Sequence, residues 1–394
     1  RNVTFVADVS TAKIADLVVI QDNSVADGAM ANTLRMRVTD AFGNTLGGQT
    51  VSVTADNSAM VASTVITGPD GTVEISVTSQ TAGISIVTAS INNSSLSRDV
   101  TFVADVRTAQ IADLVVIKDG SEADGLTANT LQVRVTDAFG NALAGQTVSV
   151  LGGNGATVSP TVITGPDGTV EISVTSQTAG VSAVTATINS SSQSQNVTFI
   201  ADVSTAKIAD LVVIKDGSEA DGSTANTLRV RVTDAFGNTL AGQTVSVLAD
   251  NGATTAPTVI TEPDGTVEIS VTSQTAGVSA VTASINSSSQ SRNVTFVADV
   301  RTAQIADLVV IKDGSEADGA TANTLRARVT DAFGNALAGQ AVSVMAGNSA
   351  TVTPTVTTQS DGTVEFSVTS QTAGTSTVTA SINSSSLSRD VTFI

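Results

Sequence analysis

The stretch Leu228-Arg229-Val230-Arg231-Val232-Thr233-Asp234-Ala235-Phe236-Gly237-Asn238 carries the two signals that decide the fold. In its first half, the apolar residues Leu228, Val230 and Val232 alternate with polar ones, which predicts a β-strand with one face on a core and the other in water. Its second half, from Asp234 to Asn238, has the Asp, Gly and Asn composition of a tight turn. Strand followed by turn is therefore the expected local unit.

The same unit recurs around this stretch. Val267, Ile269 and Val271 again alternate with polar residues, and Pro263-Asp264-Gly265-Thr266 predicts a turn with a left-handed Gly. No segment shows a capped helical stripe, and the abundant Ser and Thr favour strands and turns. The spacing predicts about seven short strands per repeat, which is typical of an immunoglobulin-like (Ig-like) sandwich. We therefore expect an all-β fold.

Two details of this sandwich are also predicted. Because Trp, Tyr and Cys are absent, the core must consist of aliphatic residues and two Phe per repeat, such as Phe139 at a turn and Phe199 on the last strand. The segment from Ile208 to Ile214 is apolar on both faces, which predicts a strand that is covered on two sides or lies near a domain junction.

The motif Asp-Ala-Phe-Gly-Asn returns every 97 residues without insertion or deletion, beginning at Asp40, Asp137, Asp234 and Asp331. A period of this length fits a self-sufficient small domain rather than a solenoid unit. We predict five segments: the C-terminal strand of a preceding repeat at 1–9, and Ig-like repeats at 10–106, 107–203, 204–300 and 301–394. Because the chain begins in the middle of the pattern and without Met, we expect a segment of a longer protein.

Composition excludes several functions. The 394 residues include no Cys and no His, so the usual zinc sites, thiol nucleophiles, disulfides and imidazole bases are excluded. A net charge of −18 disfavours nucleic acids and anionic membrane surfaces as partners. The longest strongly apolar run, about Leu114 to Ile117, is far shorter than the ~20 residues of a membrane span. We expect no enzyme activity, no small-molecule substrate, no cofactor, and no catalytic, cofactor-binding or metal-binding residue.

Two alternatives to an inert domain come from the charged residues. Acidic side chains gather in one connection of three repeats and could supply oxygen ligands to calcium, although the spacing matches no known loop and solvated acids are the favoured interpretation. These residues are Asp119, Glu122, Asp124, Asp216, Glu219, Asp221, Asp313, Glu316 and Asp318, with Asp202 and Asp210 near a junction. A Lys–Asn cross-link is disfavoured because the position of Lys118, Lys215 and Lys312 is Gln21 in the first repeat. Asp40, Asp137, Asp234 and Asp331 are expected to fix their turns by accepting backbone hydrogen bonds two or three residues on, with Gly140 supplying positive φ.

The junctions between repeats are short. Between Thr198 and Gly217 the chain crosses from one repeat to the next with no Gly or Pro, which predicts a semi-rigid rod about 140–160 Å long for four domains. The repeats also alternate in pairs at three positions, which are Lys13, Gln110, Lys207 and Gln304; Ser10, Arg107, Ser204 and Arg301; and Thr45, Ala142, Thr239 and Ala336.

A combination of short motifs, present in all four repeats, resembles the bacterial Ig-like group 1 domain of the intimin and invasin adhesins, which are inverse autotransporters. In the third repeat the motifs are Lys215-Asp216-Gly217, Ala225-Asn226, Val232-Thr233-Asp234, Gly237-Asn238, Gly242-Gln243-Thr244-Val245, Asp264-Gly265-Thr266, Thr275-Ala276-Gly277 and Val281-Thr282-Ala283.

This resemblance implies a stalk segment of a Gram-negative surface adhesin. Such a segment is held at the cell outer membrane by a barrel outside this chain and presents a distal binding domain for cell attachment or biofilm formation. The alternative is that the repeats themselves bind host or neighbouring-cell proteins or glycans by weak, multivalent contacts. Binding of cells by the purified segment alone distinguishes the two.

Overall fold

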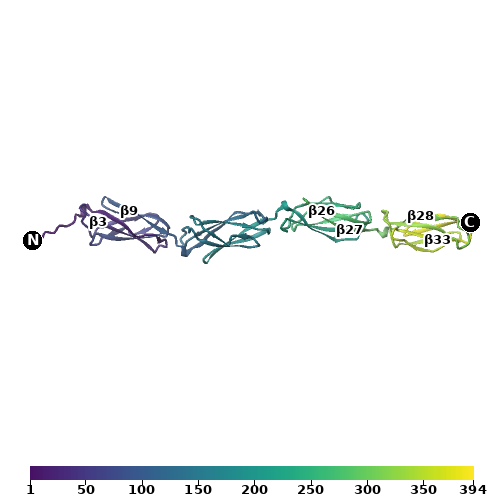
Figure 1. The fold of residues 1–394 in the computed structure, drawn as a ribbon, viewed down its shortest axis with the longest axis horizontal. Helices are drawn as coiled ribbons and strands as arrows, with labels where there is room; N and C mark the ends of the chain where they lie inside the picture. Colours follow the sequence, from purple (N-terminus) through teal and green to yellow (C-terminus); the bar gives the residue numbers. More distant parts are fainter. The chain divides into compact units, whose positions relative to one another are not determined.

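The computed structural model describes all of residues 1–394, which divide into two compact units, Arg1–Ala201 and Asp202–Ile394. Each unit contains two β-sandwiches, which Figure 1 draws as ribbons coloured along the sequence. We name them domain 1 (β1–β9), domain 2 (β10–β18), domain 3 (β19–β27) and domain 4 (β28–β35). The all-β prediction is confirmed, because the only helices are four 3-10 turns of three residues each.

The first unit holds domains 1 and 2. Domain 1 consists of η1 (Val9–Thr11), β1 (Lys13–Gln21), β2 (Ser24–Val25), β3 (Ala31–Thr39), β4 (Thr50–Ala55), β5 (Met60–Val61), β6 (Thr64–Ile66), β7 (Thr72–Thr78), β8 (Gly83–Ile91) and β9 (Ser94–Val103). Domain 2 consists of η2 (Val106–Thr108), β10 (Gln110–Lys118), β11 (Ser121–Glu122), β12 (Asn129–Thr136), β13 (Thr147–Gly152), β14 (Thr157–Val158), β15 (Thr161–Ile163), β16 (Thr169–Thr175), β17 (Gly180–Ile188) and β18 (Ser191–Ile200).

The second unit holds domains 3 and 4. Domain 3 consists of η3 (Val203–Thr205), β19 (Lys207–Lys215), β20 (Ser218–Glu219), β21 (Asn226–Thr233), β22 (Thr244–Ala249), β23 (Thr254–Thr255), β24 (Thr258–Ile260), β25 (Thr266–Thr272), β26 (Gly277–Ile285) and β27 (Ser288–Val297). Domain 4 consists of η4 (Val300–Thr302), β28 (Gln304–Lys312), β29 (Asn323–Thr330), β30 (Ala341–Ala346), β31 (Thr351–Val352), β32 (Thr355–Thr357), β33 (Thr363–Thr369), β34 (Gly374–Ile382) and β35 (Ser385–Phe393).

Every domain packs a four-stranded sheet on a second sheet. In domain 1 the strand orders are β1-β3-β7-β5 and β2-β9-β8-β4-β6. All pairs are antiparallel except β2 with β9, where the chain runs back alongside its own last strand. In domain 4 a single bridge between Ser315 and Phe393 replaces the two-residue strand, so its second sheet has four strands. Domain 1 therefore has nine strands, of which seven are three residues or longer, as the spacing predicts.

The core lies between the two sheets. Leu228, Val230 and Val232 are fully buried on β21, and Phe199 on β18 is 1% exposed. The period-two pattern thus placed the correct face inward, because successive strand residues point to opposite sides of a sheet. Burying a side chain of this size contributes about 1.5–3 kcal/mol to folding.

One prediction about the core is wrong, and another holds in one of its two alternatives. Phe139 is 46% exposed and lies at the end of the sandwich, outside the core cluster. The segment Ile208 to Ile214 lies in the edge strand β19, directly after the entry segment η3, so the predicted position near a domain junction is confirmed, whereas cover on two faces is not, because Ile214 is 49% exposed. Register shifts between Ile208 and Asp210 and between Val213 and Lys215 break its alternation, so an apolar run can have one buried and one exposed face.

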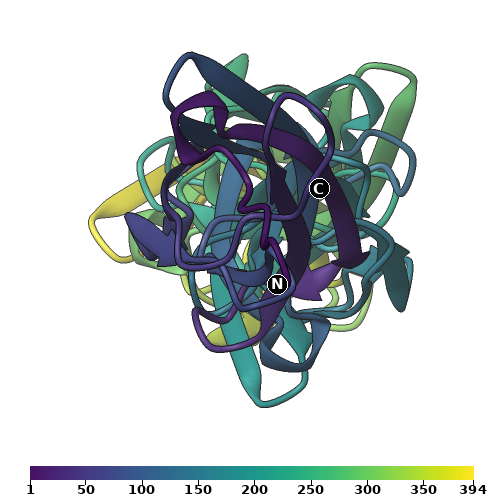
Figure 2. The same cartoon turned by 90° about the vertical axis from the view of Figure 1, so that its left-hand side faces the viewer.

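The N-terminal end of each sandwich is where a neighbouring segment of chain enters. Figure 2 views domain 1 from this end, where residues 1–8 lead into η1. No helix in the structure has the length and apolar character needed to cross a membrane.

Candidate functional site at the domain junctions

The Asp-Ala-Phe-Gly-Asn turn is held by one carboxylate. Asp137 is fully buried, and its Oδ1 accepts hydrogen bonds from the backbone N–H groups of Phe139 and Asn141, both at 2.9 Å. Gly140 has φ +90°, a left-handed conformation that Gly adopts without steric cost. The predicted turn-fixing role of Asp137 is confirmed, with donors two and four residues on. The equivalent Asp40 has a lowered pKa, first because the Asn44 side chain donates to it.

The same carboxylate also holds the segment that leads into the domain. Asp137 Oδ2 accepts the backbone N–H of Asp105 at 3.1 Å, and Asp105 Oδ1 in turn caps η2 by accepting the N–H of Arg107 at 3.1 Å. Thr108 Oγ1 accepts the N–H of Ala138 at 3.2 Å. The entry segment is therefore fixed to the domain that it enters.

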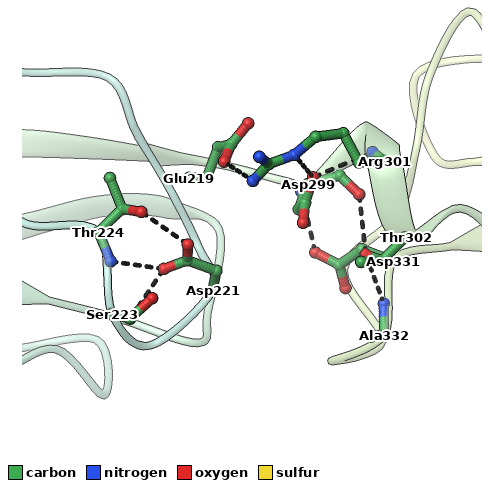
Figure 3. A network of polar contacts seen from close by, with 9 residues as sticks. All are labelled: Glu219, Asp221, Ser223, Thr224, Asp299, Arg301, Thr302, Asp331 and Ala332. Atoms are coloured by element: carbon green, nitrogen blue, oxygen red, sulfur yellow. Dashed lines mark hydrogen bonds and ion pairs between the residues drawn. The ribbon is translucent and has the colours of Figure 1, made fainter.

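Figure 3 shows the same arrangement in the second unit. Asp331 Oδ2 accepts the N–H of Asp299 at 3.2 Å, and Thr302 Oγ1 accepts the N–H of Ala332 at 3.2 Å. Asp299 also forms an ion pair with Arg301, whose Nε lies 3.0 Å from Asp299 Oδ1. Two junctions of this chain thus share one local structure.

The last residue of the turn reaches the preceding domain. Asn141 Oδ1 accepts the N–H of Ala82 at 2.8 Å, and Asn141 Nδ2 donates to the carbonyl of Gln80 at 2.9 Å and to Asp137 Oδ2 at 2.8 Å. Gln80 and Ala82 lie in the loop between β7 and β8 of domain 1. One amide therefore ties the buried Asp of domain 2 to a loop of domain 1.

Asn335 repeats this contact between domains 3 and 4. Its Oδ1 accepts the N–H of Ala276 at 2.8 Å, and its Nδ2 donates to the carbonyl of Gln274 at 2.9 Å. We name Asn141 and Asn335 the latch asparagines. The turn motif gives no sign of this second role, because an Asn in such a turn has the same sequence context whether or not a second domain contacts it.

The Phe of the turn also marks the junction. Phe42 of domain 1 is 87% exposed, whereas Phe139 and Phe333 are each 46% exposed. Because Asn141 in the same turn contacts domain 1, we attribute the extra cover on Phe139 to that domain. The side chain that was predicted to fill the core therefore lies at the end of the sandwich that faces the junction turn's partner domain.

Comparison with known protein families matches residues 14–103, 111–200, 208–297 and 305–394 to the family described as bacterial Ig-like domain (group 1). The chain belongs to this family. A curated relative, the inverse autotransporter adhesin YeeJ of Escherichia coli strain K12, is 32% identical over 374 residues, which cover 87% of this chain and 16% of the relative. The chain thus spans a small part of that protein's length.

Two solved structures are also similar. The crystal structure of invasin, described as a bacterial integrin-binding protein, shares 23% identity at a TM-score of 0.45, covering 96% of this chain and 79% of that chain. The structure of FdeC, described as a broadly conserved Escherichia coli adhesin, shares 20% identity at a TM-score of 0.47, covering 74% of this chain and 100% of that chain.

The acidic connection of these group 1 Ig-like domains has its own hydrogen-bond partners. Asp124 Oδ1 accepts the N–H groups of Leu126 and Thr127 at 2.7 and 2.6 Å, and Asp119 Oδ1 accepts the N–H of Thr198 at 2.6 Å. The pKa of Asp221 is held far below its usual range, first by the Thr224 hydroxyl and then by backbone N–H groups. The structure contains no group of three or more His, Cys, Asp or Glu side chains that could hold a metal ion. These carboxylates therefore cap loops.

The lysines of the same connection are satisfied locally. Lys118 Nζ donates to the carbonyl of Ala128 at 2.9 Å, and Lys215 Nζ donates to Ala225 in the same way. The nearby Asn129 side chain is already used, because its Nδ2 donates to the Thr198 carbonyl and its Oδ1 accepts the N–H of Ser121. The lysines and Asn129 of this connection thus stabilise its local structure.

Proposed function

We propose that this chain is a non-enzymatic stalk segment of a Gram-negative surface adhesin, a semi-rigid spacer that presents a distal binding domain for cell attachment or biofilm formation. The observation that carries the proposal is the second attachment at each described junction. A linker alone lets two domains rotate about one point, whereas the linker together with a latch asparagine joins them at two. Membership of the Ig-like family and similarity to an inverse autotransporter adhesin support this proposal.

The proposal places the chain outside the cell, on the surface of the outer membrane, and held there by a barrel domain elsewhere in the protein. An acidic surface with a net charge of −18 keeps neighbouring copies apart by like-charge repulsion. The absence of Cys suits a chain that passes unfolded through an oxidising periplasm, because no premature disulfide can form.

Reach is the property that tests this function. We expect small-angle scattering from the purified segment to give a maximum dimension of about 140–160 Å, from strands rising ~3.3 Å per residue in four domains. On cells, deleting residues 107–300 from the whole protein should shorten its reach and weaken attachment. Replacing them by a Gly/Ser linker of equal residue number should not restore it, because such a linker is a flexible coil. Full attachment with the flexible linker would refute the spacer role.

The same purified segment tests the alternative. If the segment by itself coats host or bacterial cells in a saturable way, the repeats bind directly and the spacer proposal is insufficient. A segment of four similar faces would then gain strength from multivalency, so binding should fall steeply when domains are removed. Absence of binding by the segment, with attachment by the whole protein, supports presentation of a distal domain.

A further inference from the structure

Arg301 is the one arginine whose side chain forms an ion pair with a different domain. Its Nε lies 3.0 Å from Asp299 Oδ1 in its own entry segment, and its Nη2 donates to Glu219 Oε2 of domain 3 (Figure 3). The pKa of Arg301 is raised, first by Asp299 and further by the charges of Glu219 and Asp221. The guanidinium thus bridges the two domains.

Glu219 is well placed to receive this contact. It lies on β20, which pairs in parallel with the end of β27, so that Glu219 is opposite Val297, four residues before Arg301. The junction is therefore held at three segments of domain 3: the end of β27, the β20 edge and the loop that contacts Asn335. Three separate contacts limit the rotation that two contacts leave free.

The first unit provides a natural comparison. Arg107 occupies the position of Arg301, but Val25 stands where domain 3 has Glu219, and Val25 likewise lies opposite Val103 at the end of β9. Because domain 1 has no carboxylate at the position of Val25, Arg107 donates from two of its nitrogens to Asp105, with Nε at 3.0 Å from Oδ1 and Nη2 at 3.4 Å from Oδ2. The same arginine thus forms an ion pair across one junction, whereas across the other only the charge of Asp27 in domain 1 attracts it, without an ion pair.

We propose that Arg301 and Glu219 are positioning residues that form an inter-domain clasp, and that, where a domain is entered through an arginine as at Arg107 and Arg301, the residue at the Glu219 position of the preceding domain decides whether the clasp forms. The two described junctions then differ in stiffness: the distribution of distances between domains 3 and 4 should be narrower than that between domains 1 and 2, and its width should depend on salt concentration. This inference deepens the proposed spacer function and rests on it for its biological meaning, whereas the clasp itself is a property of the isolated chain.

The chain has no Cys, so introduced cysteines can be spin-labelled without background. Ser289→Cys with Ser386→Cys reports the domain 3–4 distance, and Ser95→Cys with Ser192→Cys reports the domain 1–2 distance at equivalent, exposed positions. Pulsed electron paramagnetic resonance on the four-domain chain then gives the width of each distance distribution.

Exchanging the two natural residues tests the clasp in both directions. Glu219→Val should broaden the domain 3–4 distribution, with the ratio of clasped to unclasped forms falling roughly 1.4- to 5-fold, the range for an exposed ion pair. Val25→Glu should narrow the domain 1–2 distribution by giving Arg107 a partner. Glu316→Val, the same change in domain 4, is the matched control and should leave the domain 3–4 distribution unchanged.

Salt provides the second readout. In 1 M salt the Debye length falls to ~3 Å, so the wild-type domain 3–4 distribution should broaden toward that of Glu219→Val, which itself should change little. The clasp is refuted if Glu219→Val keeps the wild-type width at low salt while circular dichroism shows a folded chain. Cell binding by the segment would instead overturn the spacer function and leave the distance result standing, so the two failures can be told apart.

Discussion

Replacing Asn141 by Ala removes the latch between domains 1 and 2 without touching either core. The side chain makes three hydrogen bonds, of which those to Ala82 and Gln80 cross the junction and the one to Asp137 stays within domain 2. Two neutral hydrogen bonds contribute together about 1–3 kcal/mol, and a bond to a carboxylate about 1.5–3 kcal/mol. We therefore expect a loss of coupling between the domains and a separate, intradomain loss of stability.

The Ala82 amide reports the coupling directly, because its N–H donates to Asn141 Oδ1. Loss of one neutral hydrogen bond of ~0.5–1.5 kcal/mol should accelerate its hydrogen exchange roughly 2- to 13-fold. The intradomain part is measured by Asn44→Ala, since Asn44 Nδ2 donates to Asp40 Oδ2 at 2.8 Å in the same way. That variant should destabilise domain 1 and leave the local protection of Ala82 unchanged relative to the rest of its domain.

Asn335→Ala is the symmetrical control. It should accelerate exchange at Ala276, whose N–H donates to Asn335 Oδ1, and leave Ala82 at the wild-type rate. Asn141→Ala should do the reverse. If Ala82 exchanges at the wild-type rate in Asn141→Ala while amides of domain 2 are accelerated, the latch contributes only to its own domain and the reasoning from the junction geometry fails.

Three further predictions concern single domains. Ser182 has a buried hydroxyl with no hydrogen-bond partner, so Ser182→Ala should stabilise domain 2 by about 1 kcal/mol in urea unfolding. Ser176→Ala should instead destabilise domain 2, because the Ser176 hydroxyl donates to the Thr178 carbonyl and accepts the N–H of Thr178. Gly265 has φ +76° and an added Cβ would lie 2.9 Å from Val232 O, so Gly265→Ala should lower the melting temperature more than Gly237→Ala, where a Cβ meets open space. The pKa of Asp318 is lowered to about 2, chiefly by the backbone N–H of Thr321; its stabilising contribution is therefore complete above about pH 4 and lost as the pH falls toward 2, and acid titration of domain 4 should be shallower in Asp318→Asn.

Strands and turns were predictable because their signals are local. The alternation at Leu228, Val230 and Val232 fixes which face is buried, and Gly265 takes the left-handed conformation expected of its turn. For the edge strand starting at Lys207, the sequence could not distinguish cover on two faces from a position near a junction, because two bulges change its pattern and a bulge leaves no clear mark in a run of aliphatic residues. Local sequence therefore gave the sandwich but not the exposure of its edge.

The junction could not be predicted, because its contacts join residues far apart in sequence. Asn141 meets Gln80 across 61 positions, and nothing in the turn motif indicates that an amide serves a second domain. Phe139 shows the same limit, because we attribute its partial cover to a neighbouring domain, which the sequence of its own repeat does not reveal. An apolar residue is favoured both in a core and at a domain end that another domain covers, so the residue type alone does not distinguish the two positions.

The alternation between repeats acquires a physical meaning from these contacts. All three alternating positions lie around the junction turn. At the first, Arg301 and Ser204 each donate a hydrogen bond to the Asp side chain that caps their entry segment. At the second, Gln304 Nε2 donates to the Asp331 carbonyl at 3.2 Å and Lys207 Nζ donates to the Ala235 carbonyl at 3.1 Å. The third position is bridged to the strand before the turn, as in Thr136 with Ala142. Core positions vary as well: Leu228 is Leu in all four repeats, but the fully buried position of Val230 is Met36, Val133 and Ala327 in the others. The paired alternation thus falls on residues around the junction turn, where it can change the contacts between one domain and the next.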